Sequence, residues 1–171
     1  MAATDWHIAQ VNVALLRAPL DAPELHGFVA LLEPINALAD SSPGFVWRLQ
    51  GESGNATGIR AFDDERIIVN LSVWETIEAL GLFVFASRHN EVLRRRREWF
   101  EKMAEAHLAL WWVPAGTLPT VEEAERRVAM VRDRGALPEA FTLREPFPAP
   151  GSNVPVPAQD RWRYPTTSPA G

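Results

Sequence analysis

Two segments of the chain, 7–16 and 66–74, combine β-branched residues with an alternation of apolar and polar side chains over part of their length. Successive side chains of a strand point to opposite faces of a sheet, so this pattern predicts two half-buried strands. Each strand then has one face that carries amides, a hydroxyl or an indole: Gln10 and Asn12 in the first, and Asn70, Ser72 and Trp74 in the second. No other pattern limits the fold as strongly.

The rest of the chain supplies partners for these strands. Two further strands are predicted at 45–50 and 107–113, and an edge-like fifth strand at 140–144. The polar, glycine-containing stretch 51–65 predicts a loop between the second and third strands.

Apolar residues at helical spacing predict three helical regions, 25–38, 76–103 and 120–134. In the first, Asp21 is the expected N-cap, Pro23 suits the first turn, and Pro34 predicts a kink or break. A polar interruption at Ser87 divides the second region into two helices.

The third helical region has clear boundaries. Thr120 and Glu123 have the spacing of a capping box, and Gly135 ends the helix.

This order of elements predicts an α+β fold with a ferredoxin-like antiparallel sheet and helices on one face. We expect one domain over 6–148, followed by a Pro-rich tail over 149–171 that is extended or disordered. A sheet with one uncovered face needs a partner, and a second copy is the simplest one, so we expect a homodimer.

Composition excludes several classes of function. The net charge of −5 argues against a nucleic-acid partner. Since the chain has no cysteine, it has no thiolate chemistry, and it has neither a membrane-length apolar run nor a signal-like start. We therefore expect a cytoplasmic protein without a membrane partner.

The histidines give no metal motif, because His7, His26, His89 and His107 lie on different predicted elements without i, i+4 spacing. We therefore expect no metal site, with a site formed by His7 and His107, which both begin strands, as the alternative.

Amides and hydroxyls are poor acids and bases, but they hold an oxygen or a phenolate well in an aromatic-lined cavity. The face that carries Asn12 and Asn70 is therefore the candidate binding site for a small molecule. The same face could instead pair its amides with the partner of a dimer. The arginines 94–97 spread around a helix and predict a solvated, salt-bridged surface, with one inward-turned arginine on a substrate anion as the alternative.

Several blocks, in order along 6–148, resemble the bacterial domain-of-unknown-function 3291 family. They are Ile8–Asn12, Ile35–Ala39, Ser42–Leu49, Val69–Glu75, His89, Arg94–Phe100 and Leu110–Gly116. That family resembles a branch of the dimeric α/β-barrel superfamily, which contains the antibiotic-biosynthesis monooxygenases. The resemblance implies a ferredoxin-like protomer, a homodimer that closes a barrel, and a cavity between sheet and helices, while the fold does not determine the reaction.

Haem-degrading members of that superfamily pair an asparagine on the first strand with a histidine late in the second helix. Asn12 matches the asparagine, but the helix position falls near Arg94, and His89 lies several residues earlier. We therefore expect no cofactor, with haem as the alternative.

The sequence leads to the hypothesis of a small-molecule enzyme, an oxidoreductase of biosynthesis or a cyclase/isomerase, that acts on an aromatic or polyketide-like substrate without a cofactor. The residues assigned to catalysis are Asn12, Asn70 and His89. The residues assigned to substrate binding are Gln10, Trp47, Ser72, Trp74, Arg94 and Trp99. The alternatives are a non-catalytic dimer that binds a small ligand and a haem-dependent enzyme.

Overall fold

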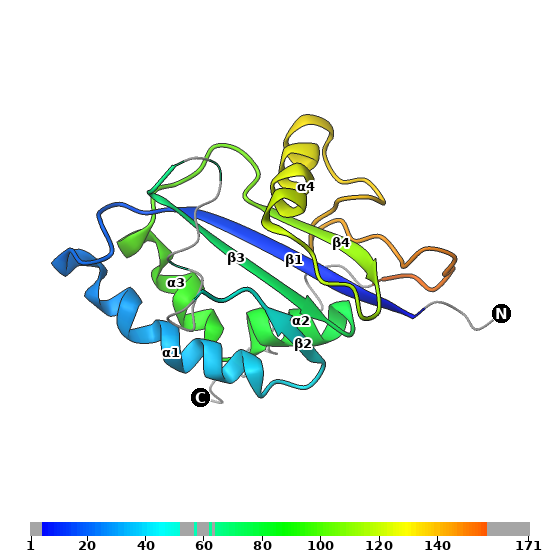
Figure 1. Cartoon of the computed structure of the whole chain (residues 1–171), viewed down its shortest axis with the longest axis horizontal. Helices are drawn as coiled ribbons and strands as arrows, with labels where there is room; N and C mark the ends of the chain where they lie inside the picture. Colours follow the sequence, from blue (N-terminus) through cyan, green and yellow to red (C-terminus); the bar gives the residue numbers. More distant parts are fainter. Residues whose placement is uncertain (1–4, 52–56, 58–61, 63, 157–171) are drawn as a thin grey trace, which may run out of the picture.

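The computed structural model describes residues 5–51, 57, 62 and 64–156. In chain order the elements are β1 (Trp6–Leu15), a 3-10 turn η1 (Pro23–Leu25), α1 (His26–Asp40), β2 (Phe45–Arg48), β3 (Ile67–Trp74), α2 (Ile77–Ala86), α3 (His89–Trp99), β4 (Leu108–Pro114) and α4 (Val121–Arg134). The predicted α+β class is confirmed (Figure 1). None of the helices in these residues is long and apolar enough to cross a membrane.

The four strands form one antiparallel sheet in the order β2-β3-β1-β4. The two alternating segments are its central strands, as Figure 1 shows. Their register pairs Gln10 with Ser72 and Asn12 with Asn70. Because residues paired in register point to the same face, the predicted polar face exists on both central strands.

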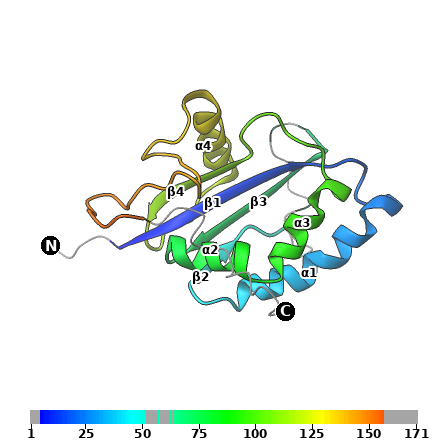
Figure 2. The same ribbon diagram turned by 180° about the vertical axis from the view of Figure 1, so that it is seen from behind.

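One face of the sheet is covered by α1, α2 and α3, which pack on Ile8, Trp74 and Leu110 at one end of the sheet and around Leu16 and Trp99 at the other. Figure 2 shows α1 and α3 side by side on this face. We call it the helix-facing side.

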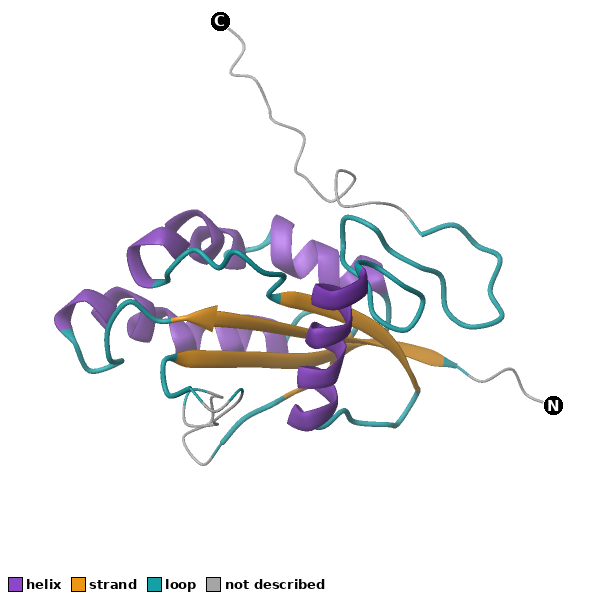
Figure 3. Cartoon of the chain, turned by 90° about the horizontal axis from the view of Figure 1, so that it is seen from above, coloured by secondary structure: helices purple, strands orange, loops and turns teal. Residues whose placement is uncertain are grey.

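The opposite face is covered by α4, which corrects the prediction that the helices lie on one face. Ala124, Val128 and Val131 of α4 pack on the apolar side chains that alternate with the polar ones. Figure 3 shows α4 crossing the sheet on the side away from the other helices. Val11 and Leu71, in the middle of this face, are each no more than 1% exposed. The uncovered face from which we predicted a homodimer is therefore closed within the chain, and the homodimer stays a prediction without that argument.

The first helix differs from its prediction in two ways. It runs from His26 to Asp40 with Pro34 inside it, so of the expected kink or break the break is wrong, and the kink stays a prediction. Proline removes one backbone donor, and the helix tolerates this loss while its remaining turns stay paired and packed. Asp21 is not the N-cap, because η1 precedes α1 and begins with Pro23 in its first turn.

The helical region after β3 is two helices, as predicted. Thr76 caps α2, since its side chain accepts a hydrogen bond from the backbone N–H of Ala79 at 3.0 Å. The Ser87 hydroxyl accepts from the backbone N–H of His89 at 3.2 Å, where α3 begins. In α4, the Thr120 side chain accepts from the N–H of Glu123 at 3.1 Å, which confirms the predicted cap.

The predicted fifth strand at 140–144 is wrong, because the chain there makes only isolated bridges. Phe141 bridges Leu110 of β4, and Ala140 bridges Leu137 in a tight turn. The chain after 145 has no helix or strand up to 156, but it packs on the body. The Phe147 carbonyl accepts the indole N–H of Trp112 at 2.9 Å, and Val156 packs on the cluster that contains Ile8 and Trp74.

Candidate functional site

Five polar residues from three strands share the helix-facing side, and we call them the polar strip: Gln10, Asn12, Arg48, Asn70 and Ser72. One row across the sheet pairs Arg48 with Ser72 and Ser72 with Gln10, and the next row pairs Asn70 with Asn12. An irregularity in β2 between Phe45 and Trp47 sets this register, so that Phe45 and Arg48 point toward the helices and Trp47 points away.

A chain of side-chain hydrogen bonds runs along the first row. The indole N–H of Trp74 donates to the Ser72 hydroxyl at 3.0 Å, and this hydroxyl donates to the Gln10 carboxamide oxygen at 2.9 Å. All three residues are buried. Polar groups removed from water must be paired, and these two hydrogen bonds pair the buried polar groups at this end of the strip and hold their side chains in place.

Trp74 is the third member of that chain, and its ring is enclosed. It is 1% exposed, it stacks on Phe83 at 5.1 Å between ring centroids, and Phe45 meets its face at 5.4 Å. The structure therefore places Trp74 beneath the site as a support for Ser72 rather than on an open pocket wall.

The second row has different surroundings. Asn70 is exposed although it lies in a central strand on the helix-facing side, so the helices do not close over the sheet at this point. Asn12, its partner in register, is half-buried, and its side-chain oxygen is buried without a hydrogen-bond partner among the described residues. An unpaired buried carbonyl costs stability, about 1–3 kcal/mol, unless water or a ligand donates to it. The two amides thus form the accessible end of the strip.

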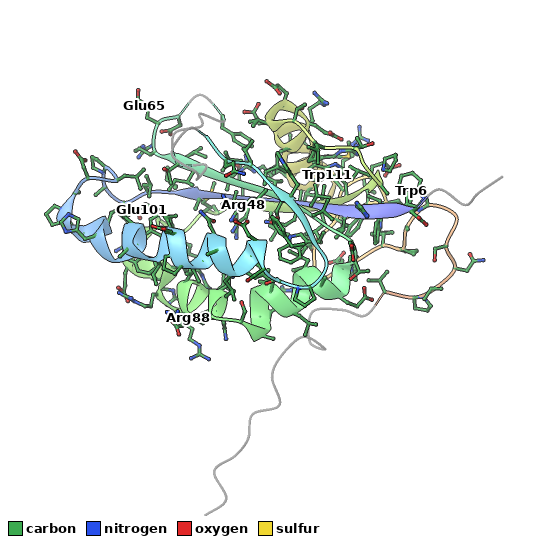
Figure 4. The ribbon with its side chains drawn as sticks, turned by 60° about the horizontal axis from the view of Figure 1, so that its bottom comes forward. Trp6, Arg48, Glu65, Arg88, Glu101 and Trp111 are labelled. Carbon is green, nitrogen blue, oxygen red and sulfur yellow. The ribbon has the colours of Figure 1, made fainter. Side chains whose placement is uncertain are left out.

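Arg48 brings a positive charge to the strip. Its Nε and Nη2 bind Oδ1 and Oδ2 of Asp40, at the end of α1, at 2.7 and 3.2 Å. Figure 4 shows Arg48 reaching from the sheet toward α1. The Arg48 side chain is 14% exposed, whereas the Asp40 side chain is 47% exposed.

His89 lies next to the strip's aromatic support. Its ring centroid is 5.0 Å from that of Phe83, and its Nδ1 is 3.3 Å from the Val84 carbonyl oxygen. Loss of hydration lowers the pKa of His89 from its ordinary value, and the hydrogen bond to the Val84 carbonyl offsets part of this effect. The His89 ring is tilted against Phe83, Phe83 stacks on Trp74, and Trp74 donates to Ser72, so two aromatic rings link this histidine to the strip.

Besides His89, three predicted site residues are not brought to the strip. Trp47 packs on the α4 side of the sheet. Trp99 is 1% exposed in a separate cluster with Phe28, where the Arg95 guanidinium lies 4.7 Å from its ring centroid. Arg94 is exposed on α3.

Sequence reasoning missed Arg48 and chose its neighbour Trp47. Strict alternation from Phe45 places Trp47 with the helix-facing residues, and only the irregularity in β2 reverses this. The charge pairing between Asp40 and Arg48, eight residues apart across a turn, was the available signal.

Two hollows in the surface lie away from the two asparagines. One of about 280 Å³ is lined by Ser42, Pro43, Ala79, Leu82, Phe83, Ala86 and Ser87. Another of about 130 Å³ lies between the start of α2, Trp112 and the segment 148–156. Within the part of the chain that the structure describes, no group of three or more His, Cys, Asp or Glu residues is placed to hold a metal ion.

A family model described as a domain of unknown function, DUF3291, matches residues 7–156. No curated protein matches the chain. Among solved structures, the chain is similar to the NE2512 protein of unknown function from Nitrosomonas europaea, at 11% identity and a TM-score of 0.41. That match covers 69% of this chain and 99% of the Nitrosomonas protein.

Proposed function

We propose that this chain, which belongs to the DUF3291 family, binds a small aromatic or polyketide-like molecule at the polar strip and transforms it without a cofactor. The observation that carries the proposal is the pair Asn12 and Asn70, matched in register at the one place where the strip opens. Among the residues that the structure describes, none donates to the Asn12 side-chain oxygen, and Asn70 is exposed.

Carboxamides suit a substrate that carries hydroxyl, carbonyl or phenolate oxygens. Each offers two N–H donors and one acceptor, and neither changes charge during a reaction. Two amides on adjacent strands hold such oxygens at fixed positions, because a sheet is more rigid than a loop.

The reaction that fits these groups is one in which the substrate supplies the electrons. An activated aromatic CH₂ reacts with dioxygen: one oxygen atom becomes a ring carbonyl, and the other leaves as water with the two hydrogens of that carbon. No external reductant is needed, and the amides stabilise the phenolate from which the electrons leave. A cyclisation or isomerisation through the same enolate would use the same contacts.

The sheet order supports the place of this chain among antibiotic-biosynthesis-monooxygenase-like proteins. The antiparallel order β2-β3-β1-β4, with a helix after β1 and helices after β3, is the arrangement of the ferredoxin-like split βαβ unit. Closure of a barrel by two such sheets would require α4 to lie at the subunit boundary.

A second candidate, binding without turnover, is favoured by the chemistry of the strip. Its members other than Arg48 are neutral, and His89 is set apart from it by two aromatic rings. Such a protein would carry or sense its ligand.

Haem would need His89 as its axial ligand. Nδ1 of His89 is 3.3 Å from the Val84 carbonyl oxygen, an arrangement that leaves Nε2 as the ligand atom, but the ring packs on Phe83, outside the polar strip. We therefore derive no step through haem.

The proposal is tested by dioxygen consumption with anthrones and related polyphenols, followed in an oxygen electrode. Asn12→Ala and Asn70→Ala should each lower kcat/KM by about 10-fold or more, since each removes a hydrogen bond to a charged oxygen. Asn153→Ala, an exposed amide outside the strip, is the matched control and should change it by less than about twofold.

Rates unchanged in both strip variants would place the reaction elsewhere. Saturable quenching of tryptophan fluorescence by these compounds, without product, would support the binding protein in place of the enzyme.

A further inference from the structure

We infer that the ligand of the polar strip carries a carboxylate, and that Arg48 receives it in exchange for the carboxylate of Asp40. This inference rests on the proposed function, because it names the chemical class of the ligand at the same site.

The first argument is position. Arg48 is paired in register with Ser72, and Ser72 is paired with Gln10, so the arginine belongs to the same row of the sheet as the hydrogen-bonded chain. The next row toward the open end holds Asn70 and Asn12. A ligand seated on the two amides therefore lies one row away from a guanidinium.

The second argument is geometry. Arg48 already binds a carboxylate side-on, through Nε and Nη2 to the two oxygens of Asp40. This fork matches the two oxygens of a carboxylate, and Arg48 makes it with a carboxylate here. The group that replaces Asp40 most readily is another carboxylate.

The third argument is the unequal burial of the pair. The arginine side chain is largely enclosed between β2 and α1, while the aspartate is about half exposed. Asp40 itself loses little when it turns into water, because its side chain is already about half exposed, whereas the largely buried Arg48 guanidinium needs an anion in its place. Arg48 stays in place. A ligand that joins a carboxylate to an apolar ring buries that ring when it binds, which favours its carboxylate over that of Asp40.

A structural role for the pair makes a different prediction. If the pair only fastens β2 to α1, loss of either partner should weaken every ligand alike. If the pair is a gate for a carboxylate, the two losses should have opposite signs for an anionic ligand and no effect for its neutral analogue.

The experiment uses the full chain at low salt with three probes of one shape: 2-naphthoate, 2-naphthamide and 2-naphthol, measured by isothermal titration calorimetry. For the unaltered protein we expect 2-naphthoate to bind about 10-fold more tightly than the other two. Arg48→Gln should remove this preference and leave 2-naphthamide within about twofold. Asp40→Asn should tighten 2-naphthoate about 3- to 10-fold, because the neutral amide competes less strongly than the Asp40 carboxylate for Arg48.

Two further variants sharpen the result. Arg48→Lys keeps the charge without the fork and should lose most of the preference. Arg66→Gln removes an arginine from the more exposed pair with Asp64 outside the strip and should change no affinity by more than about twofold. Circular dichroism and the thermal midpoint show whether each variant is folded.

Equal weakening of all probes by Arg48→Gln and Asp40→Asn would overturn the inference in favour of a structural clamp. Equal binding of naphthoate, naphthamide and naphthol would also overturn it, while the proposed function would stand. If none of the three probes binds, the inference falls, and dioxygen consumption with anthrones decides separately on the proposed function.

Discussion

The Ser72 hydroxyl donates to the Gln10 carboxamide oxygen at 2.9 Å, so β1 and β3 are joined by side chains as well as by their backbones. The same hydroxyl accepts the indole N–H of Trp74 at 3.0 Å, and a single small side chain thereby satisfies two larger ones in the core. Both side-chain hydrogen bonds at the buried end of the strip therefore involve the Ser72 hydroxyl oxygen.

Ser72→Ala should lower the free energy of unfolding by about 2–4 kcal/mol, because it leaves a buried donor on Trp74 and a buried acceptor on Gln10 unpaired. Urea denaturation followed by circular dichroism measures this. Adding Trp74→Phe to Ser72→Ala should cost less than the sum of the two single changes, since the orphaned donor is gone.

Ser41→Ala is the control for the serine change. Its hydroxyl donates to the Ala37 carbonyl at the exposed end of α1, and its loss should cost about 0.5 kcal/mol or less. Equal losses at Ser41 and Ser72 would mean that the buried chain contributes nothing specific.

The stability of the protein should fall as the pH is lowered through the unfolded-state pKa of histidine, about 6.5. Burial lowers the pKa of His89 in the folded state, so the unfolded chain binds a proton that the folded chain resists. The contribution is present above that pH, is lost on acidification, and levels off below the folded-state pKa, with a slope of at most about 1.4 kcal/mol per pH unit.

Chemical denaturation at intervals between pH 8 and pH 4 measures this slope. His89→Gln keeps a donor for the Val84 carbonyl but cannot titrate, so it should flatten the curve in the same window. If the free energy of unfolding of His89→Gln depends on pH as that of the unaltered protein does, groups other than His89 cause the acid sensitivity.

Gly44→Ala should destabilise the protein more than Gly116→Ala. Both glycines have positive φ, 80° and 89°, which costs an alanine about 1–2 kcal/mol. A Cβ on Gly44 would also lie 2.6 Å from the Cβ of Ala79 on α2, whereas a Cβ on Gly116 meets nothing within 4 Å.

The difference between the two glycine variants measures the contact between the turn before β2 and α2. We expect it to be about 1–3 kcal/mol. Gly44→Ala combined with Ala79→Gly should recover part of it, and no recovery would place the cause in the backbone alone.

The segment after 145 should contribute to stability although it has no helix or strand. Phe147→Ala removes a ring that lies 5.8 Å from the Phe141 ring, and we expect it to lower the thermal midpoint and cost about 1–2 kcal/mol. Val154→Ala, whose side chain is 69% exposed, is the control and should cost about 0.5 kcal/mol or less.

The sequence was sufficient for the central strands because apolar and polar side chains alternate in the middle of the region where they pair. It placed Gln10, Asn12, Asn70 and Ser72 on one face, and the register confirms this. The same rule failed in β2, where one irregularity in a four-residue strand turns Trp47 away and Arg48 inward. Short strands offer too few residues for alternation to reveal such a shift.

The position of α4 was beyond sequence reasoning for a different reason. Its apolar stripe predicts burial, but the face on which it packs depends on the path of the chain after β4. The prediction of helices on one face followed the order of elements alone. The role of Asn12, Asn70 and His89 in catalysis stays a prediction, since geometry shows where they lie and not what they bind.

Because α4 comes from the same chain as the sheet that it covers, closure of that face is an intramolecular event. Its contribution to folding does not depend on how many copies meet in solution. Dilution therefore leaves this part of the fold intact. The packing of α4 on the sheet should give no difference in the unfolding midpoint between micromolar and millimolar protein.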